Sequence, residues 1–333
     1  MSTLIFSLIL LCAATPYIYG QQYTSPDSVS THHLETVVVR APREPDYRRG
    51  VIPAQQLSGQ ELKALSSFSI ADALRSFSGV QVKDFGGVGG LKTVNIRSMG
   101  THHVGIFYDG VELSNAQNGQ IDLGQYSLDN MEAIQVFNGQ KGSYLQPAKD
   151  FGSSGTVYLQ TRKPTFTDGA QTNLRASLRC GSFDLFNPAI LIEHRLEPRV
   201  TMSFNTEWIK SSGKYKFRYQ KVNPLTHEIA YDTTAVRHNG DINATRLEGN
   251  LHIGLPDGQM LVKVYNYNSE RGIPGAIVNN VWRRGERLWD NNSFVQTTYE
   301  QQLCDRIRLH AIAKYAYYQT HFVRNEATAA FKV

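Results

Sequence analysis

The stretch whose composition most suggests a chemical function, phosphate binding, is the glycine-rich GGVGGLKTVNIRSMG, residues 86–100. A nucleotide-binding P-loop has the pattern G-x-x-x-x-G-K-[ST], in which backbone N–H groups and the lysine surround the phosphates. Counted from Gly86, Lys92 and Thr93 are in register, but Leu91 replaces the second glycine. The residues that follow alternate like a strand, whereas a P-loop leads into a helix. The pattern therefore favours a glycine turn between two strands, because glycine adopts positive φ without steric cost.

His102 and His103 are the residues that most suggest a metal. Neighbouring residues of a strand point to opposite faces, no Cys or carboxylate cluster accompanies the pair, and structural zinc takes four ligands. The sequence also offers no arrangement of nucleophile, base and oxyanion stabiliser. It therefore predicts no metal site, no cofactor and no enzymatic activity.

The composition indicates an exported protein with a substantial core. The chain has 333 residues, of which 41% are hydrophobic and 19% charged, and its net charge of +5 is scattered, which does not indicate nucleic-acid binding. Residues 1–20 contain an apolar run, Leu4 to Ala14, followed by small residues. This is typical of a secretory signal peptide cleaved near Gly20. The run is too short for a membrane helix, which needs about 20 apolar residues.

Residues 21–50 form a polar tail with one apolar island, HLETVVVRA. Its three valines favour an extended backbone because β-branching restricts the side chain. Such a segment can add to the sheet edge of a partner protein, or it can be an edge strand of the next domain. The residues alone leave both possibilities open.

Residues 51–163 have the pattern of a compact α+β domain. Ser58 and Glu61 fit a helix capping box, and a helix over 69–77 places Ile70, Leu74 and Phe77 on one stripe. Five strand-like segments follow: VQV, TVNIRS, HVGIFYDGV, AIQVFN and GTVYLQT. The segments 83–92 and 112–123 between them are rich in Gly, Asn, Gln and Asp and are predicted to be loops.

From residue 168 onward the pattern changes to long strands with period two. We expect seven, near residues 172–180, 187–196, 199–211, 244–255, 259–270, 291–303 and 306–323. The connections at 197–198, 256–258 and 304–305 are tight, whereas 212–243 and 271–290 are long and polar. Outer-membrane barrels have this asymmetry, with lipid-facing apolar and lumen-facing polar residues. A soluble β-sandwich also alternates and is the alternative.

The barrel topology has two further consequences. Cys180 and Cys304 fall at opposite ends of the strands, too far apart for a disulfide, which requires Cα atoms within about 7 Å. Seven strands are an odd number, whereas a bacterial barrel closes with an even one. We therefore expect the chain to be a fragment.

The motifs of residues 51–163 resemble those of TonB-dependent outer-membrane transporters. ALRSFSGVQV, VNIRSMG, IFYDGVELSN, MEAIQVFNGQKGSYL and GSSGTVYLQTRKP occur in the family's order. The resemblance implies an α+β plug domain followed by an incomplete antiparallel transmembrane β-barrel, with about 7 of about 22 strands. It also implies that the valine island is the TonB box, which pairs with TonB of the inner-membrane energising complex. The matching residues are Leu34, Glu35, Thr36, Val37, Val38 and Val39.

The resemblance further implies that loops 83–92 and 112–123 face outward and touch the ligand. The expected contacts are Asp84, Phe85, Asn115, Gln117, Asn118 and Gln120. Arg97 matches an arginine that pairs with barrel carboxylates in the family, and Asp109 and Gly110 match its DG turn, although Ser98 replaces a glycine of the pattern. The plug most resembles cobalamin and siderophore transporters, so cobalamin import is expected and ferric-siderophore import is the alternative. A secreted β-sandwich adhesion module and a nucleotide hydrolase are the rivals from other classes.

Overall fold

The computed structural model describes residues 54–65, 67, 69–115, 119–139, 151–167, 169–223, 225–275, 277–278, 281–283, 285–324 and 328–330. The described residues all belong to one compact unit, Asp46–Val333. The predicted signal peptide, the polar tail with Leu34–Val39, and Gln117 and Asn118 lie outside the described residues.

The N-terminal domain is a small mixed sheet with two short helices. Its elements are β1 (Ala54–Ser58), α2 (Gly59–Ala64), α3 (Ile70–Leu74), β2 (Val80–Asp84), β3 (Lys92–Ile96), β4 (Val104–Tyr108), β5 (Val111–Glu112), β6 (Met131–Phe137) and β7 (Gly155–Thr161). Five strands form one sheet in the order β1-β6-β7-β4-β5, in which β4 and β7 are parallel, and β2 and β3 form a separate hairpin. All five predicted strand segments are confirmed.

The helices begin where their capping residues predict. The Ser58 N–H donates to Glu61 Oε2 at 3.4 Å, and the Ser69 hydroxyl accepts the N–H of Asp72 at 3.3 Å. Ile70 and Leu74 are fully buried in the core of this domain. The helix predicted over 69–77 is shorter than expected, because after Leu74 the backbone closes into tight turns before Gly79, whose φ is +76°.

The C-terminal part is a seven-stranded antiparallel meander. Its strands are β8 (Thr172–Gly181), β9 (Leu185–Glu197), β10 (Val200–Ser211), β13 (Ile242–Leu255), β14 (Gly258–Gly272), β17 (Glu286–Cys304) and β18 (Ile307–Arg324). They are ordered β18-β17-β14-β13-β10-β9-β8, so each pairs with the members of this sheet that come before and after it in the chain. All seven predicted long strands are confirmed. Cys180 and Cys304 are free and lie on β8 and β17, which four other strands separate.

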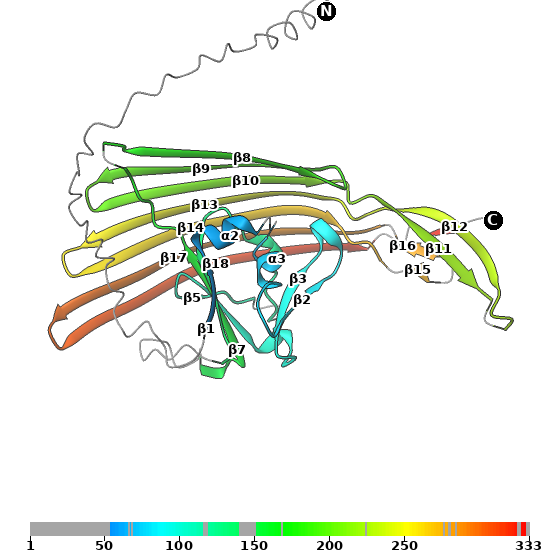
Figure 1. Ribbon diagram of the computed structural model, residues 1–333, viewed down its shortest axis with the longest axis horizontal. Coiled ribbons are helices and arrows are strands. Elements are labelled where there is room, and N and C mark those ends of the chain that lie inside the picture. Colours follow the sequence, from blue (N-terminus) through cyan, green and yellow to red (C-terminus); the bar gives the residue numbers. More distant parts are fainter. Residues whose placement is uncertain are drawn as a thin grey trace, which may run out of the picture. The chain divides into compact units, whose positions relative to one another are not determined.

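The two faces of this sheet differ in polarity, and the N-terminal domain lies against one of them (Figure 1). Phe204 and Val264, on the face turned away from that domain, are 39% and 51% exposed. Glu207 and Lys263, which lie three residues from Phe204 and one residue from Val264 on the same two strands, are 2% and 0% exposed. A soluble sandwich buries its apolar face, so this inverted arrangement is that of a barrel wall around a polar interior and argues against the sandwich alternative.

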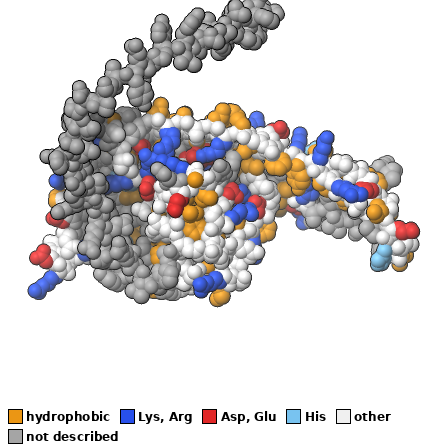
Figure 2. Space-filling view, in the orientation of Figure 1, with side chains coloured by type: hydrophobic (Ala, Val, Ile, Leu, Met, Phe, Trp, Pro, Cys, Tyr) orange, Lys and Arg blue, Asp and Glu red, His pale blue; other side chains and the backbone are white. Residues whose placement is uncertain are grey.

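The long connections contain structure that the sequence did not predict. Residues 212–243 include the hairpin of β11 (Tyr215–Val222) and β12 (Ile229–Arg237), and β15 (Ile277–Val278), β16 (Val281–Arg283) and β19 (Thr328–Ala330) form a further small sheet. Figure 2 shows positive and negative side chains side by side along the hairpin, where Arg218 pairs with Asp232 at 2.5 Å. The tight connections, between β9 and β10, β13 and β14, and β17 and β18, lie at the other end of the strands from the long connections. The turn between β8 and β9 lies at the same end as the long connections but is also short. None of the helices among the described residues has the length and apolar character needed to cross a membrane.

Candidate ligand cavity and domain interface

A cavity of ≈ 940 Å³ lies between the loops of the N-terminal domain and the sheet, at the end of the strands that carries the long connections. The N-terminal domain contributes Phe85, Gly89, Gly90, Leu91, Ser114, Asn115, Gln120, Ile121, Asp122, Gln125 and Tyr126. The sheet and its connections contribute Arg271, Gly272, Ile273, Pro274, Leu288, Asp290, Asn292, Tyr318, Gln319, Thr320 and Phe322. Both loops predicted to face outward, 83–92 and 112–123, therefore meet at this cavity.

The structure separates the predicted ligand contacts. Phe85, Asn115 and Gln120 line the cavity, and the Phe85 ring is 58% exposed. The amide of Gln120 is also 3.0 Å from Nε2 of His102. Asp84 does not line the cavity: its carboxylate accepts the N–H groups of its own loop, at Gly86 and Gly87, and faces Arg75.

The glycine run is a turn between β2 and β3, as the sequence predicts, and the P-loop alternative is wrong. Lys92 begins a strand and not a helix, and its Nζ lies 3.6 Å from Asp72 Oδ2. Gly90 is required sterically, because a Cβ there would lie 2.4 Å from the backbone N of Gly86. The run therefore shapes the cavity wall with its backbone.

The floor of the cavity is an ion-paired arginine from the sheet. Arg271, 5% exposed, lies 2.9 Å from Asp122 of the N-terminal domain and 2.8 Å from Asp290 of β17. It also donates to the carbonyl oxygen of Gly89 at 3.1 Å. The other carboxylate oxygen of Asp122 accepts the N–H of Lys92 at 3.0 Å. The glycine turn, the second loop and the sheet thus meet at one guanidinium group.

A second polar cluster lies deeper in the interface, around Lys263. Its ammonium group, fully buried, is 2.6 Å from Glu248 Oε1 and 2.9 Å from Asp109 Oδ2, and it lies 3.6 Å from the ring centroid of Tyr108. The Tyr108 hydroxyl donates to Glu248 at 2.8 Å, and Thr161 donates to Asp109 through N–H and hydroxyl. A buried charge of this kind is tolerated only when it is paired and hydrogen-bonded, and this one is paired across the two domains.

Aromatic rings join the two clusters. The Tyr126 ring stacks on Tyr265 of β14 at 5.3 Å, and Tyr265 stacks on Phe294 of β17 at 4.8 Å. The Tyr265 hydroxyl donates to the backbone carbonyl of Gln125, and the Asn292 amide donates to the Gln125 side chain at 2.7 Å. Such stacked pairs contribute stabilisation beyond that of the area they bury, so they hold the end of loop 112–123 against the seven-stranded sheet.

The predicted role of Arg97 finds no support among the described residues. The Arg97 side chain is exposed in a turn at φ +50°, and no ion pair joins it to a described carboxylate. The main ion pairs between the domains have the opposite polarity, with the cation on the sheet and the acid on the N-terminal domain. Arg179 with Asp129 is a further example.

Residues 48–149 match the family model of the TonB-dependent Receptor Plug Domain. The chain carries a TonB-dependent receptor plug. Together with the seven-stranded wall, this confirms the predicted resemblance and the predicted fold class, a plug followed by part of an antiparallel barrel. The predicted plug boundaries of 51–163 and the other domain limits stay predictions.

Solved structures of such receptors share the fold of plug and wall. The copper transporter OprC is 15% identical, with a TM-score of 0.58 over 80% of this chain and 37% of that chain. The ferric-catecholate import receptor Fiu from E. coli K12, in its open form, is 12% identical, with a TM-score of 0.55 over 81% and 39%. The ferric yersiniabactin uptake receptor FyuA from Yersinia pestis is 12% identical, with a TM-score of 0.54 over 81% and 41%. The chain spans about two fifths of the length of these structures, and the likeness is one of fold.

Proposed function

We propose that this protein is an outer-membrane TonB-dependent transporter that binds a scarce polar ligand in the cavity between the plug loops and the wall. The observation that carries the proposal is the inverted polarity of the wall. Its apolar face is exposed and its charged face holds a plug, as expected for a protein with lipid outside and an aqueous interior. A transporter and not an enzyme is also what the matching plug family suggests.

The ligand contacts that we propose are Phe85, Asn115 and Gln120, together with Gln117 and Asn118 of the same sequence segment, 112–123. Amide groups donate and accept hydrogen bonds, which suits a polar ligand with both kinds of group. Cobalamin is our first candidate because of the plug motifs. A ferric siderophore is the second candidate, because two of the similar structures are named as uptake receptors for ferric compounds.

We further propose that residues 34–39 are the TonB box. This segment precedes β1 in the sequence, and an extended segment of this kind can add to the sheet edge of a partner such as TonB. Pairing of this kind uses backbone N–H groups. A proline within it removes one donor and fixes φ.

The Val38→Pro variant tests the energised step. We expect cells that express the gene with this change to bind the ligand at the surface but to lose energy-dependent uptake. Val38→Thr, which keeps the backbone N–H and the β-branched shape, is the matched control and should retain uptake. Full uptake by Val38→Pro would argue against the TonB box at this position.

Ligand identity requires a separate comparison. Binding of radiolabelled cobalamin and of ferric siderophores is measured on outer membranes that contain the protein, with and without Asn115→Ala and Gln120→Ala. We expect one ligand class to bind saturably and to bind more weakly to both variants. If the protein fractionates as soluble, the transporter proposal is refuted, and if neither class binds, both ligand candidates are wrong.

A further inference from the structure

The floor of the ligand cavity has more negative than positive charge. Asp122 and Asp290 both pair with Arg271, at 2.9 Å and 2.8 Å, so two carboxylates share one guanidinium group. Among the described residues that line the cavity, Arg271 is the only Lys or Arg, and these two aspartates are the only acids. The described lining therefore has one negative charge in excess. Gln117 and Asn118, the proposed contacts outside the described residues, are uncharged amides.

Arg271 does not offer its fork of N–H groups to a ligand. One terminal nitrogen donates to Asp122 and to the carbonyl oxygen of Gly89, and the other donates to Asp290. An arginine that recognises an anion directs two parallel N–H groups at it. In this structure the guanidinium group is buried and directs them at acceptors of the protein itself. Its role is to join the plug to the wall.

Two further cations beside the cavity also have partners. Lys92 follows the lining residue Leu91, but its Nζ lies 3.6 Å from Asp72 Oδ2. Arg237 donates to the carbonyl oxygen of the lining residue Pro274 at 2.8 Å. Both side chains therefore stabilise the walls of the cavity, and neither is among the residues that line it.

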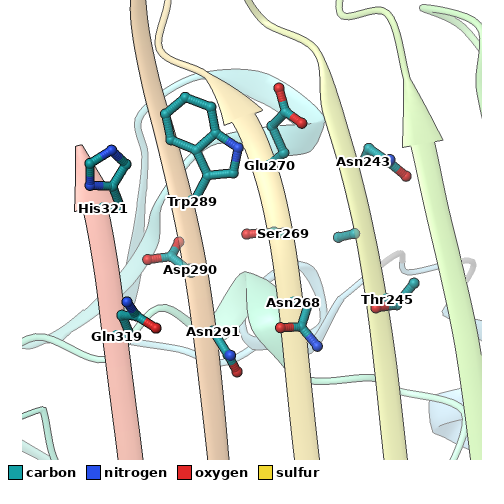
Figure 3. Close-up of a pocket in the computed structure, with 11 residues that line it drawn as sticks. Asn243, Thr245, Asn268, Ser269, Glu270, Trp289, Asp290, Asn291, Gln319 and His321 are labelled. Carbon is teal, nitrogen blue, oxygen red and sulfur yellow. The ribbon is translucent and has the colours of Figure 1, made fainter. Parts of the chain in front are cut away.

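Little water screens the two acids at the floor. Asp122 and Asp290 are both buried. Figure 3 shows the Asp290 carboxylate on the side of β17 that faces β18, where it accepts the hydroxyl of Thr320 at 2.9 Å. Charges at buried positions are screened by salt much less than charges on the surface. The excess negative charge therefore acts on whatever enters the cavity.

Exposed aromatic rings add a preference in the same direction. Phe85 of the plug and Tyr318 and Phe322 of β18 line the cavity, and they are 58%, 37% and 50% exposed. The face of an aromatic ring is the negative part of its quadrupole, so it attracts cations and packs against apolar surface. Such rings do not compensate an anion for the hydration that it loses on binding. They favour a neutral or cationic ligand.

We infer that the cavity accepts neutral or cationic ligands and excludes anionic ones. The inference rests on the proposed function and narrows its ligand class. It favours cyanocobalamin, which has no net charge, and ferric hydroxamate siderophores, which are neutral or cationic, over the anionic ferric catecholates. The amides of segment 112–123 can donate and accept the hydrogen bonds that such a ligand requires.

A cysteine reporter measures the charge of the cavity without knowledge of the ligand. Ser114 lines the cavity and is exposed, and Ser114→Cys replaces only its oxygen atom. The protein is expressed from its own gene and studied in outer membranes, with Cys180→Ser and Cys304→Ser to remove the two exposed native thiols. The measurement is the ratio of the reaction rates with a cationic and an anionic methanethiosulfonate reagent at low salt.

We expect this ratio to be about tenfold higher at Ser114→Cys than in a reference variant that retains only Cys304. Asp290→Asn keeps the shape of the side chain, removes the excess charge and should lower the ratio to the reference value. Asp257→Asn removes the same charge from the exposed turn between β13 and β14 and should leave the ratio unchanged. A ratio equal to the reference, a ratio unaffected by Asp290→Asn, or no reaction with either reagent overturns the inference.

Binding of whole ligands to the unmodified protein is an independent test. Outer membranes are titrated with cyanocobalamin, with a neutral ferric tris-hydroxamate, with a cationic ferric tris-hydroxamate that has a free amine, and with an anionic ferric tris-catecholate. We expect saturable binding from the neutral or cationic compounds and none from the catecholate. Saturable binding of the catecholate overturns the inference and leaves the transporter proposal intact. Fractionation of the protein as soluble contradicts the transporter proposal instead.

Discussion

Replacing Lys263 with methionine tests whether the buried ion pairs hold the plug in the wall. The change removes the cation that lies 2.6 Å from Glu248 and 2.9 Å from Asp109, while methionine fills most of the volume. Both carboxylates then stay buried with no cation between them. Removing one partner from a buried pair costs about 3–5 kcal/mol. With an m-value of about 2–3 kcal/mol/M in urea, the midpoint of plug opening falls by about 1–2.5 M.

Pulse proteolysis with trypsin at increasing urea measures this opening, because a plug that leaves the wall exposes its Lys and Arg sites. Lys210→Met is the control, since Lys210 is exposed on the outward face. Asp109→Asn combined with Lys263→Met completes a double-mutant cycle, in which we expect a coupling of about 1–3 kcal/mol. A Lys263→Met midpoint equal to that of Lys210→Met would show that this cluster does not hold the plug.

Two further predictions concern the wall and the cavity. Val264→Arg, midway along β14 on the apolar face, should cost about 2–4 kcal/mol in assembly, whereas Leu309→Arg, close to a tight turn, should cost about 0–1 kcal/mol. Heat-modifiable gel migration measures this difference, and equal effects contradict the outward assignment of Val264. Gly90→Ala places a Cβ 2.4 Å from the backbone N of Gly86 and should weaken ligand binding, whereas Gly152→Ala, with open space around its Cβ position, should not. Equilibrium binding to outer membranes compares the two, and unchanged binding by Gly90→Ala would mean that the turn does not shape the site.

The strands of the wall were predictable because their signal is long and local. A period of two over nine or more residues is hard to mistake, and strands such as β8 and β10 contain such a run. The hairpin β11–β12 was missed because the alternating segment YKFRYQKV has only 8 residues and stands in a stretch that is polar on average. The end of α3 was placed too late because Phe77 fits the apolar stripe, although its N–H bonds back only three residues, to Leu74.

The candidate site was predictable as a pair of loops but not as a set of contacts. The sequence places loops 83–92 and 112–123 between strands, and the structure brings both to one cavity. The sequence does not reveal that the Asp84 carboxylate turns back to its own loop, because that contact depends on local backbone geometry. Nor does it reveal that Arg271 meets Asp122, because 149 residues separate the two and no period links them. The sequence signal that could have indicated these contacts was the set of charged residues on the polar face of the strands, such as Glu248, Lys263 and Arg271.

The polarity of the interface bears on how a plug can be held firmly and still move. Buried ion pairs such as Arg271 with Asp122 are costly to break when one partner is deleted, because the other charge stays buried. When the plug moves away as a unit and water enters, both charges are hydrated again, and the hydration offsets most of the lost Coulomb attraction. An apolar interface has no such compensation, since separating it exposes apolar surface at about 25 cal/mol per Å². Movement of the plug within the wall during the proposed energy-dependent uptake therefore has a lower free-energy cost across an interface of paired charges with a small aromatic cluster than across a hydrophobic core of the same area.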